Sequence, residues 1–165
     1  MKTIVIAHNI RSIHNIGSIL RTCDGLGVTR VYCTGYTPYP EIPSDTRLPH
    51  LRAKITARIH KTALGAEKNV LVEHSVDLEP VLDKLARQGY ELAALEQSPR
   101  STLLAHFTPR ANKLALLLGE EVHGIPQTLL ARFDSIIEIP MSGKKESFNV
   151  SVAAGIALYI LQNIV

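Results

Sequence analysis

The first stretch of this sequence that could do chemistry is residues 9–22, which read NIRSIHNIGSILRT. Apolar residues recur there at helical spacing, so we expect a helix with one buried face. Asn15 stands just before this stripe and fits the N-cap position, while Arg21 lies on the other side of the helix. An amide and a guanidinium presented together suit a phosphate-bearing substrate. A capped helix with a solvated arginine is the simpler alternative.

Gly17 lies one turn before Arg21 in the same predicted helix. Glycine inside a helix costs about 1 kcal/mol relative to alanine, so its presence indicates that another group approaches the helix closely. We therefore expect a close contact at Gly17.

The second stretch, residues 116–126, reads LLLGEEVHGIP and places two glutamates and two glycines after an apolar run. This pattern indicates a buried strand that ends at Gly119. We expect Glu121 either to pair with the Arg21 side chain or to hold a loop by accepting backbone N–H groups. An ordinary acidic loop after a strand is the alternative.

The third stretch, residues 139–160, reads IPMSGKKESFNVSVAAGIALYI and passes from a basic loop into an apolar helix. Ser147 or Asn149 could cap that helix, but capping explains only one of them. It does not explain the preceding Gly-Lys-Lys loop either. A helix that is apolar nearly all round is either fully buried or shared with another subunit, so we expect a homodimer through the C-terminal helix, residues 149–163.

Several nucleotide and metal signatures are missing from the sequence. The SGKKES segment lacks the upstream glycine of a phosphate-binding P-loop, and GLGVTR has Arg30 in place of the third glycine of a dinucleotide fingerprint. GLGVTR also follows a predicted helix, where a helix C-cap is the better interpretation. The seven histidines form no HExxH or Cys/His cluster, and no GxSxG elbow is present, so we expect no metal site.

Apolar runs alternate with helical patterns along the chain, which indicates an α/β fold with a mostly parallel sheet flanked by helices. The predicted strands are 3–7, 30–34, 70–73, 91–95, 113–118 and 136–139. The predicted helices are 16–26, 51–66, 78–88, 126–132 and 149–163. Polar or glycine-containing loops follow Leu95, Leu118 and Ile139. Ligands bind beyond the carboxyl ends of parallel strands, so we expect a small-molecule pocket there.

Composition is that of a globular protein, with 45% hydrophobic and 20% charged residues, and 165 residues fit one domain. A formal charge of +3 permits a polyanionic partner without requiring one. Cys23 and Cys33 form no CxxC pair and no leader segment is recognised, which together favour the cytoplasm. The last apolar stretch is shorter than the ~20 residues that cross a bilayer, so we expect no membrane span.

In this order, the three stretches resemble the three motifs of the SpoU (TrmH-type) RNA ribose 2′-O-methyltransferases of the SPOUT superfamily. The matching segments read N-x-G-S-I-x-R-T, L-G-E-E-x-x-G-I-P and I-P-M-x-G-x-x-x-S-F-N-V-S-V-A-A, from residue 9 to about residue 160. Phe148 departs from the family, which usually has leucine there. Many relatives carry an additional N-terminal RNA-recognition domain, whereas residues 1–165 resemble a single SPOUT domain without that extension.

The resemblance implies an α/β fold whose C-terminal part forms a deep trefoil knot, which composition and periodicity alone would not indicate. It also implies S-adenosylmethionine as the cofactor, bound mainly through backbone groups of the knot loops. The implied cofactor-binding residues are Leu95, Gly119, Ile139, Met141, Ser147 and Phe148. Relatives are homodimers with active sites assembled across the interface, in agreement with the apolar last helix.

The same resemblance implies methyl transfer from S-adenosylmethionine to a ribose 2′-hydroxyl of structured RNA, either tRNA or rRNA. The implied catalytic residues are Arg21, Asn15, Glu121, Ser147 and Asn149. The family proposal makes Arg21 a general base, but a guanidinium with a reference pKa of ~12.5–13.8 is protonated at neutral pH. Stabilisation of the forming alkoxide is the alternative role.

Basic residues indicate where RNA could dock. From residue 47 to residue 61 the chain has five lysines and arginines and no acid. The residues that we expect to contact RNA phosphates are Arg11, Arg47, Arg52, Lys54, Arg58, Lys61, Lys144 and Lys145. A solvated helix face is the usual explanation for such a stripe.

Two other functions fit parts of the sequence. A non-catalytic RNA-binding protein could keep the same fold, although the intact catalytic set speaks against it. A nucleotide-dependent oxidoreductase is disfavoured by the missing glycine fingerprint. The sequence does not identify the modified nucleotide, nor does it distinguish tRNA from rRNA as the substrate.

Overall fold

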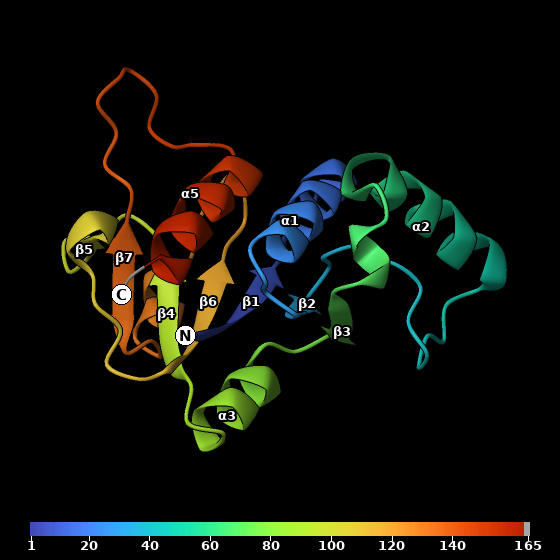
Figure 1. The fold of residues 1–165 in the computed structure, drawn as a ribbon, viewed down its shortest axis with the longest axis horizontal. Coiled ribbons are helices and arrows are strands. Elements are labelled where there is room, and N and C mark those ends of the chain that lie inside the picture. The colour runs from blue at the N-terminus through green and yellow to red at the C-terminus, as the bar shows by residue number, and fades with distance from the viewer. Residues whose placement is uncertain (164–165) are drawn as a thin grey trace.

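Apolar runs of the sequence form the central strands of a parallel sheet, shown in Figure 1. The computed structural model describes residues 1–163. Its strands are β1 (Lys2–His8), β2 (Arg30–Thr34), β3 (Leu71–Ser75), β4 (Glu91–Leu95), β5 (Thr102–Leu103), β6 (Lys113–Leu118) and β7 (Ser135–Glu138). Within the described residues they form one seven-stranded sheet in the order β3-β2-β1-β6-β4-β7-β5, and all neighbouring pairs are parallel. The predicted parallel sheet is confirmed, and only the two-residue β5 was too short for its periodicity to be recognised.

Helices cover both faces of the sheet (Figure 1). They are α1 (Ile13–Gly25), α2 (Pro49–Ala63), α3 (Glu79–Arg87), α4 (Gln127–Leu130) and α5 (Val150–Gln162), with 3₁₀ turns η1 (Ala66–Lys68) and η2 (Leu104–His106). Successive residues of β1 point to opposite faces. Val5 and Ala7 join the core under α1, α2 and α5, whereas Ile4 and Ile6 join the core that includes α3 and α4. α4 has four residues and is shorter than the predicted helix 126–132.

Strand register aligns the carboxyl ends of the central strands. Ala7 of β1 pairs with Leu118 of β6, and Leu118 also pairs with Leu95 of β4. Leu95 in turn pairs with Ile137 of β7. The loops that follow these strands therefore emerge side by side at one edge of the sheet, which is where parallel α/β sheets bind ligands.

Two helix starts were predicted with different success. α1 begins at Ile13, because the Ser12 side chain accepts a hydrogen bond from the Asn15 backbone N–H (3.2 Å) and so forms the N-cap. The predicted N-cap role of Asn15 is therefore wrong, and Asn15 lies within the first turn. At the last helix, Asn149 rather than Ser147 is the N-cap residue of α5.

Gly17 lies where α2 packs against α1. A Cβ atom at this position would be 2.0 Å from Thr62 Oγ1 and 2.5 Å from the Ile59 carbonyl oxygen. Thr62 also donates a hydrogen bond to the His14 carbonyl oxygen (3.0 Å). The predicted close contact at Gly17 is thus correct, and the group that approaches is α2.

Replacing Gly17 by alanine should lower the free energy of unfolding by about 1–3 kcal/mol, because the added methyl group overlaps α2. The control is Gly25→Ala in the same helix, where a Cβ atom would meet no atom of the described residues within 4 Å. This control should be neutral or stabilise by up to about 1 kcal/mol, because alanine favours the helix. Urea unfolding followed by circular dichroism measures both, and equal stabilities would contradict the contact.

Candidate functional site

A cavity of about 290 Å³ opens at the carboxyl edge of the sheet, among the loops that follow β4, β6 and β7. Its wall includes all six predicted cofactor-binding residues: Leu95, Gly119, Ile139, Met141, Ser147 and Phe148. These residues come from three separate segments of the chain. The pocket expected at the strand ends is therefore present, and the residues expected to bind the cofactor form part of its wall.

Two residues directly after β4 tie together the other loops of the cavity, and neither was predicted as a site residue. Glu96 Oε2 accepts a hydrogen bond from the Ile125 backbone N–H (2.7 Å), in the segment after β6. Gln97 Nε2 donates to the Glu146 carbonyl oxygen (2.7 Å), in the segment after β7. Only the polar character of the residues after Leu95 could have pointed to them, because their partners lie 29 and 49 positions away.

Two glycines let the loop after β6 turn back against the cavity wall. Gly124 has φ +65°, and a Cβ atom there would be 2.3 Å from Glu96 Oε2. A Cβ atom at Gly119 would be 2.4 Å from Ile125 Cγ1. A side chain at either glycine would therefore push this loop away from Glu96 and open the cavity wall.

Glu121 connects the loop after β6 to the start of α1. Its carboxylate accepts hydrogen bonds from the backbone N–H groups of Arg11 (3.1 Å) and Ser12 (3.2 Å) and from the Asn15 side chain (3.1 Å). Burial works against the ionised form, but these hydrogen bonds outweigh it and lower the pKa of Glu121. Of its two predicted roles, holding a loop is correct, and the described residues show no ion pair between Glu121 and Arg21.

Asn149 extends this network to the last helix. Its Nδ2 donates to Asn15 Oδ1 (3.2 Å), and its Oδ1 accepts from the Ser151 backbone N–H (2.9 Å). Three of the five predicted catalytic residues, Asn15, Glu121 and Asn149, are therefore joined by hydrogen bonds. A fourth, Ser147, lies in the cavity wall two residues before Asn149.

Arg21 is not brought to the cavity within one chain. Its side chain is exposed, is not part of the cavity wall, and has no hydrogen bond or ion pair with any residue in the described part of the chain. Arg21 stands six residues after Asn15, which corresponds to about 9 Å along a helix axis. The predicted catalytic residues thus separate into a connected group around Glu121 and an arginine that faces solvent.

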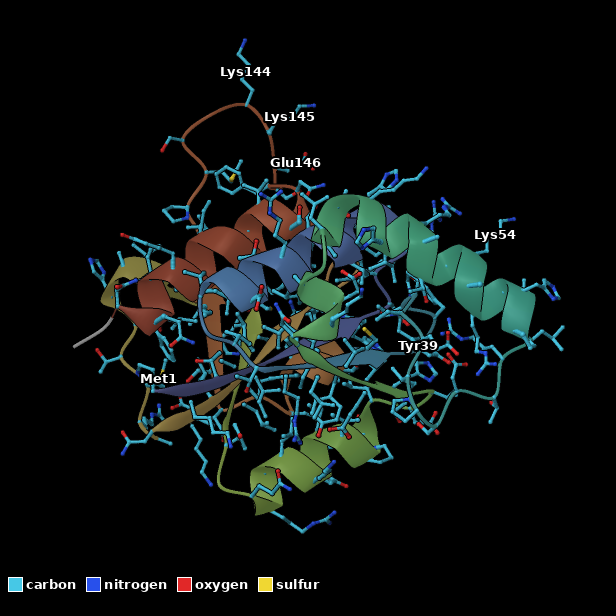
Figure 2. All side chains as sticks on the ribbon, turned by 45° about the vertical axis from the view of Figure 1, so that its right-hand side comes forward. Met1, Tyr39, Lys54, Lys144, Lys145 and Glu146 are labelled. Carbon is cyan, nitrogen blue, oxygen red and sulfur yellow. The ribbon has the colours of Figure 1, made fainter. Side chains whose placement is uncertain are left out.

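The predicted RNA contacts fall into two groups. Figure 2 shows Lys54 on the outer side of α2 and Lys144 and Lys145 at the tip of the loop before α5. Six of the eight predicted side chains are exposed and form no ion pair within residues 1–163: Arg11, Lys54, Arg58, Lys61, Lys144 and Lys145. Their contact with RNA stays a prediction.

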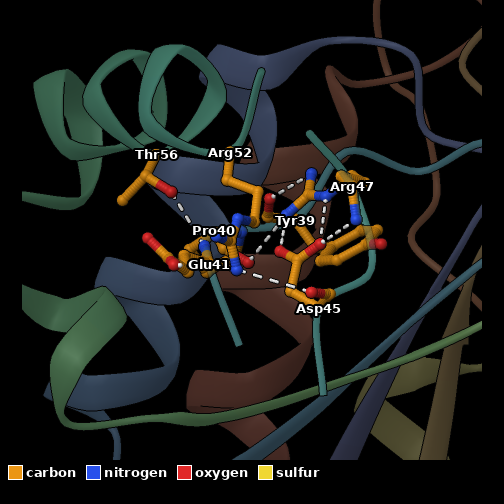
Figure 3. Close-up of polar contacts among 7 residues, drawn as sticks. All are labelled: Tyr39, Pro40, Glu41, Asp45, Arg47, Arg52 and Thr56. Atoms are coloured by element: carbon orange, nitrogen blue, oxygen red, sulfur yellow. Dashed lines mark hydrogen bonds and ion pairs between the residues drawn. The ribbon is translucent and has the colours of Figure 1, made fainter. Parts of the chain in front are cut away.

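The other two, Arg47 and Arg52, make polar contacts with the segment between β2 and α2 (Figure 3). The Arg47 guanidinium donates to both carboxylate oxygens of Asp45 and to the Tyr39 carbonyl oxygen, and it lies 3.6 Å from the centre of the Tyr39 ring. Arg52 forms an ion pair with Glu41 (3.2 Å). These contacts occupy donors that a phosphate would need, so both arginines primarily hold this segment in place.

Comparison with known proteins adds information on relatives. The profile described as "SpoU rRNA Methylase family" matches residues 2–159. The 23S rRNA (guanosine-2′-O-)-methyltransferase RlmB of Xylella fastidiosa is 32% identical, over 94% of this chain and 56% of its own length. The tRNA (guanosine(18)-2′-O)-methyltransferase of Thermus thermophilus is 30% identical, over 96% of this chain and 73% of its own length. The chain thus spans little more than half the length of the Xylella relative.

A solved structure shows the same fold. The AdoMet-bound rRNA methyltransferase from Sinorhizobium meliloti superposes with a TM-score of 0.80 and 21% sequence identity. The match covers 98% of this chain and 56% of that one. The two chains therefore share a fold.

Asp45→Asn should destabilise the protein at neutral pH. Hydrogen bonds from the Arg47 side chain lower the pKa of Asp45 from its ordinary value of 3.8 to about 2. The folded state binds this proton less readily than the unfolded state, so the contribution of Asp45 to stability is complete well above pH 3.8 and is lost as the pH falls toward about 2. Urea unfolding should show a difference between wild type and variant that shrinks over this range.

The control for this variant is Asp77→Asn. Asp77 is exposed, and its side chain has no hydrogen-bond partner among the described residues. The Asp77→Asn variant should match the wild type in its free energy of unfolding throughout the same pH range. A difference between wild type and Asp45→Asn that does not change with pH would contradict the assigned ion pair.

Proposed function

The chain belongs to the SpoU rRNA methylase family, and we propose that it transfers the methyl group of S-adenosylmethionine to a ribose 2′-hydroxyl of structured RNA. One observation carries the proposal: the six residues that family resemblance assigns to the cofactor all line one cavity at the carboxyl edge of the sheet. The two curated relatives bear the names of guanosine 2′-O-methyltransferases of rRNA and tRNA, which supports the same reaction.

The charge of the cavity fits this cofactor. Four glutamates belong to its wall, Glu96, Glu120, Glu121 and Glu146, and the wall contains no lysine or arginine among the described residues. S-adenosylmethionine carries a sulfonium and an ammonium group, whereas ATP and NAD carry phosphates that these carboxylates would repel. The volume of about 290 Å³ is near the lower end of the ~300–1,000 Å³ of small-molecule sites.

The residues of the chain would have distinct roles in the reaction. The bound cofactor supplies a methyl group that is already activated on sulfur. The protein must place a ribose hydroxyl in line with this methyl group and stabilise the oxygen as it releases its proton to solvent water. Leu95, Ile139 and Met141 would exclude water from the cavity wall. The Glu121–Asn15 contact would hold the start of α1 at a constant position beside the ribose.

Arg21 would enter the site from a second subunit, because its side chain lies outside the cavity of its own chain. A homodimer through the C-terminal helix, residues 149–163, is supported by apolar side chains that face solvent on α5. Val152 is 49% exposed and Tyr159 is 62% exposed, and they lie two turns apart on one helix face. Because a guanidinium keeps its proton, stabilising the forming alkoxide suits Arg21 better than acting as a base.

The knotted path of the chain and the cytoplasmic location of the enzyme are also proposals that rest on family membership. Family membership supports a deep trefoil knot in the C-terminal part of the chain, formed by the loops that share the cavity wall. The RNA substrate would be tRNA or rRNA, and the enzyme would act on it in the cytoplasm. Separately, none of the helices within residues 1–163 has the length and apolar character needed to cross a membrane.

A protein that binds RNA without methylating it is the second candidate function. The position of Arg21 outside the cavity of its own chain is the observation that favours it. The intact contact of Asn15 with Glu121 and Asn149 favours the enzyme. A methyl-transfer assay separates the two.

S-adenosylhomocysteine should bind the purified protein in titration calorimetry, whereas NAD and ATP should not, because the acidic wall disfavours phosphates. Transfer of a labelled methyl group to a mixture of tRNA and rRNA, followed by mapping of the 2′-O-methylated nucleotides, should identify the substrate. Binding of S-adenosylhomocysteine without methyl transfer to RNA would favour the RNA-binding alternative. No binding at all would remove the proposed function.

Arg21→Ala should lower methyl transfer by about two orders of magnitude or more, because an electrostatic stabiliser of the transition state is lost. Its affinity for S-adenosylhomocysteine should not change. Arg21→Lys should also be slow, since lysine cannot present a bidentate guanidinium. Arg87→Ala, at an exposed arginine of α3, is the control and should keep full activity. Near-normal transfer by Arg21→Lys would argue against the guanidinium role.

Mixed dimers test whether Arg21 acts from the second subunit. Gly119→Val should disrupt the cavity of its own chain, because even a Cβ atom there would be 2.4 Å from Ile125 Cγ1 and would push the loop after β6 out of place. Each variant alone should be inactive. Mixing Arg21→Ala with Gly119→Val should restore activity, because one site then combines an intact cavity with an intact arginine. No recovery in dimers shown to be mixed would contradict action across the interface.

A further inference from the structure

Tyr36 lies in the turn after β2, where its backbone is held on both sides. Gly35, with φ +66°, is so close to Asn9 that a Cβ atom would be 1.9 Å from Asn9 Oδ1. Asn9 has φ +55°, an uncommon conformation for a residue other than glycine, and its Oδ1 accepts from the Tyr36 backbone N–H (3.3 Å). Thr37 donates to the Ala7 carbonyl oxygen (3.0 Å). The turn is therefore fixed to the end of β1.

His8 fixes the orientation of the Asn9 amide. His8 Nδ1 lies 2.9 Å from Thr34 Oγ1, and His8 Nε2 lies 3.1 Å from Asn9 Nδ2. Because Asn9 Nδ2 is a donor, His8 Nε2 must accept, so the imidazole is neutral with its proton on Nδ1. Burial lowers the pKa of His8, which favours this neutral form. Asn9 Oδ1 is thereby left to accept from the Tyr36 backbone.

The Tyr36 side chain, in contrast to its backbone, is 53% exposed. Desolvation and then the charges of Glu120 and Glu121 raise the pKa of Tyr36. The backbone contacts place the turn beside the loop that holds these glutamates, because Asn9, which accepts from the Tyr36 backbone N–H, stands two residues before Arg11, which binds Glu121. Both glutamates belong to the cavity wall. Arg11 is exposed on the same surface, and its backbone N–H donates to Glu121 (3.1 Å). The ring is thus a neighbour of the cavity rather than part of its wall.

We propose that Tyr36 stacks on a nucleobase of the RNA substrate next to the nucleotide whose ribose enters the cavity, while the Arg11 side chain contacts the adjoining phosphate. This inference rests on the proposed function and adds a base-contacting residue to it. Unpaired bases stack on aromatic rings with little regard to sequence. A ring on a fixed backbone offers such a surface at a low cost in conformational entropy.

The neighbouring charges favour a base over a phosphate at the ring. Glu120 and Glu121, in the loop that packs beside this turn, would repel a phosphate placed on Tyr36, whereas a base is neutral. Arg11 is the cation of the same surface and suits the phosphate. The Tyr36 ring would therefore contact the base, and the Arg11 guanidinium would contact the phosphate backbone of the same RNA strand.

Binding of a short fluorescein-labelled oligoadenylate RNA and of an abasic strand of equal length tests the stacking, with fluorescence anisotropy as the readout. Tyr36→Ala should weaken binding of oligoadenylate about tenfold and change binding of the abasic strand less than about twofold. Tyr36→Phe keeps the ring and should stay within about twofold of wild type on both. Arg11→Ala should weaken both and reduce their salt dependence.

The matched control is Val76→Ala. Val76 is 73% exposed, and its carbonyl oxygen accepts a hydrogen bond from the Gly35 backbone N–H, so it belongs to the same turn region without an aromatic ring. This variant should bind both RNAs like the wild type. A loss equal to that of Tyr36→Ala would mean that the turn, and not the ring, is responsible, and would overturn the stacking role.

Other outcomes would also overturn it: no loss for Tyr36→Ala, equal loss on both RNAs, or equal loss for Tyr36→Phe. A changed subunit association of Tyr36→Ala in light scattering would instead assign the ring to an interface between subunits. Titration of the wild type with S-adenosylhomocysteine separates the two proposals. If it binds while Tyr36→Ala keeps normal RNA affinity, only the stacking role fails; if it does not bind, the proposed function fails.

Discussion

The carboxylate of Glu121 is the interaction on which the arrangement of the site depends. Three N–H donors converge on it at 3.1–3.2 Å, all from the first residues around the start of α1 and 106–110 positions away in the sequence. These three donors stabilise the ionised carboxylate, and the negative charge in turn strengthens the hydrogen bonds that hold the start of α1. Asn15 passes the connection on to Asn149, which begins α5. Two helices and one strand end are thereby held around the same cavity.

The sheet and most helices could be predicted because apolar runs and periodicity are local properties of the chain. The runs LALLL and SIIE correspond to β6 and β7, and the predicted close contact at Gly17 is present. The start of α1 was placed wrongly because Ser12 and Asn15 are both good capping residues, and the choice between them depends on backbone geometry. The six residues of the cavity wall followed from family resemblance, and register explains why they meet.

The site residues that the sequence analysis missed act through contacts that leave no pattern in the neighbouring sequence. Glu96 and Gln97 bind backbone groups of two other loops, and no spacing rule connects such partners. Arg47 was read as part of a basic surface because a sequence does not show that Asp45 and the Tyr39 ring occupy its guanidinium. Charge counted along a chain therefore overstates the charge that a partner meets, since local ion pairs remove part of it.

The common direction of the strands divides the connections of the molecule between two opposite edges. Those after the strands build the cavity, while those before them, such as the exposed turn at Gly89 that leads into β4, lie far from it. Glu91 fastens this far edge by accepting the backbone N–H groups of Arg110 and Ala111. Insertions and deletions at the Gly89 turn would therefore be tolerated during evolution, whereas length changes at the opposite edge would alter the chemistry.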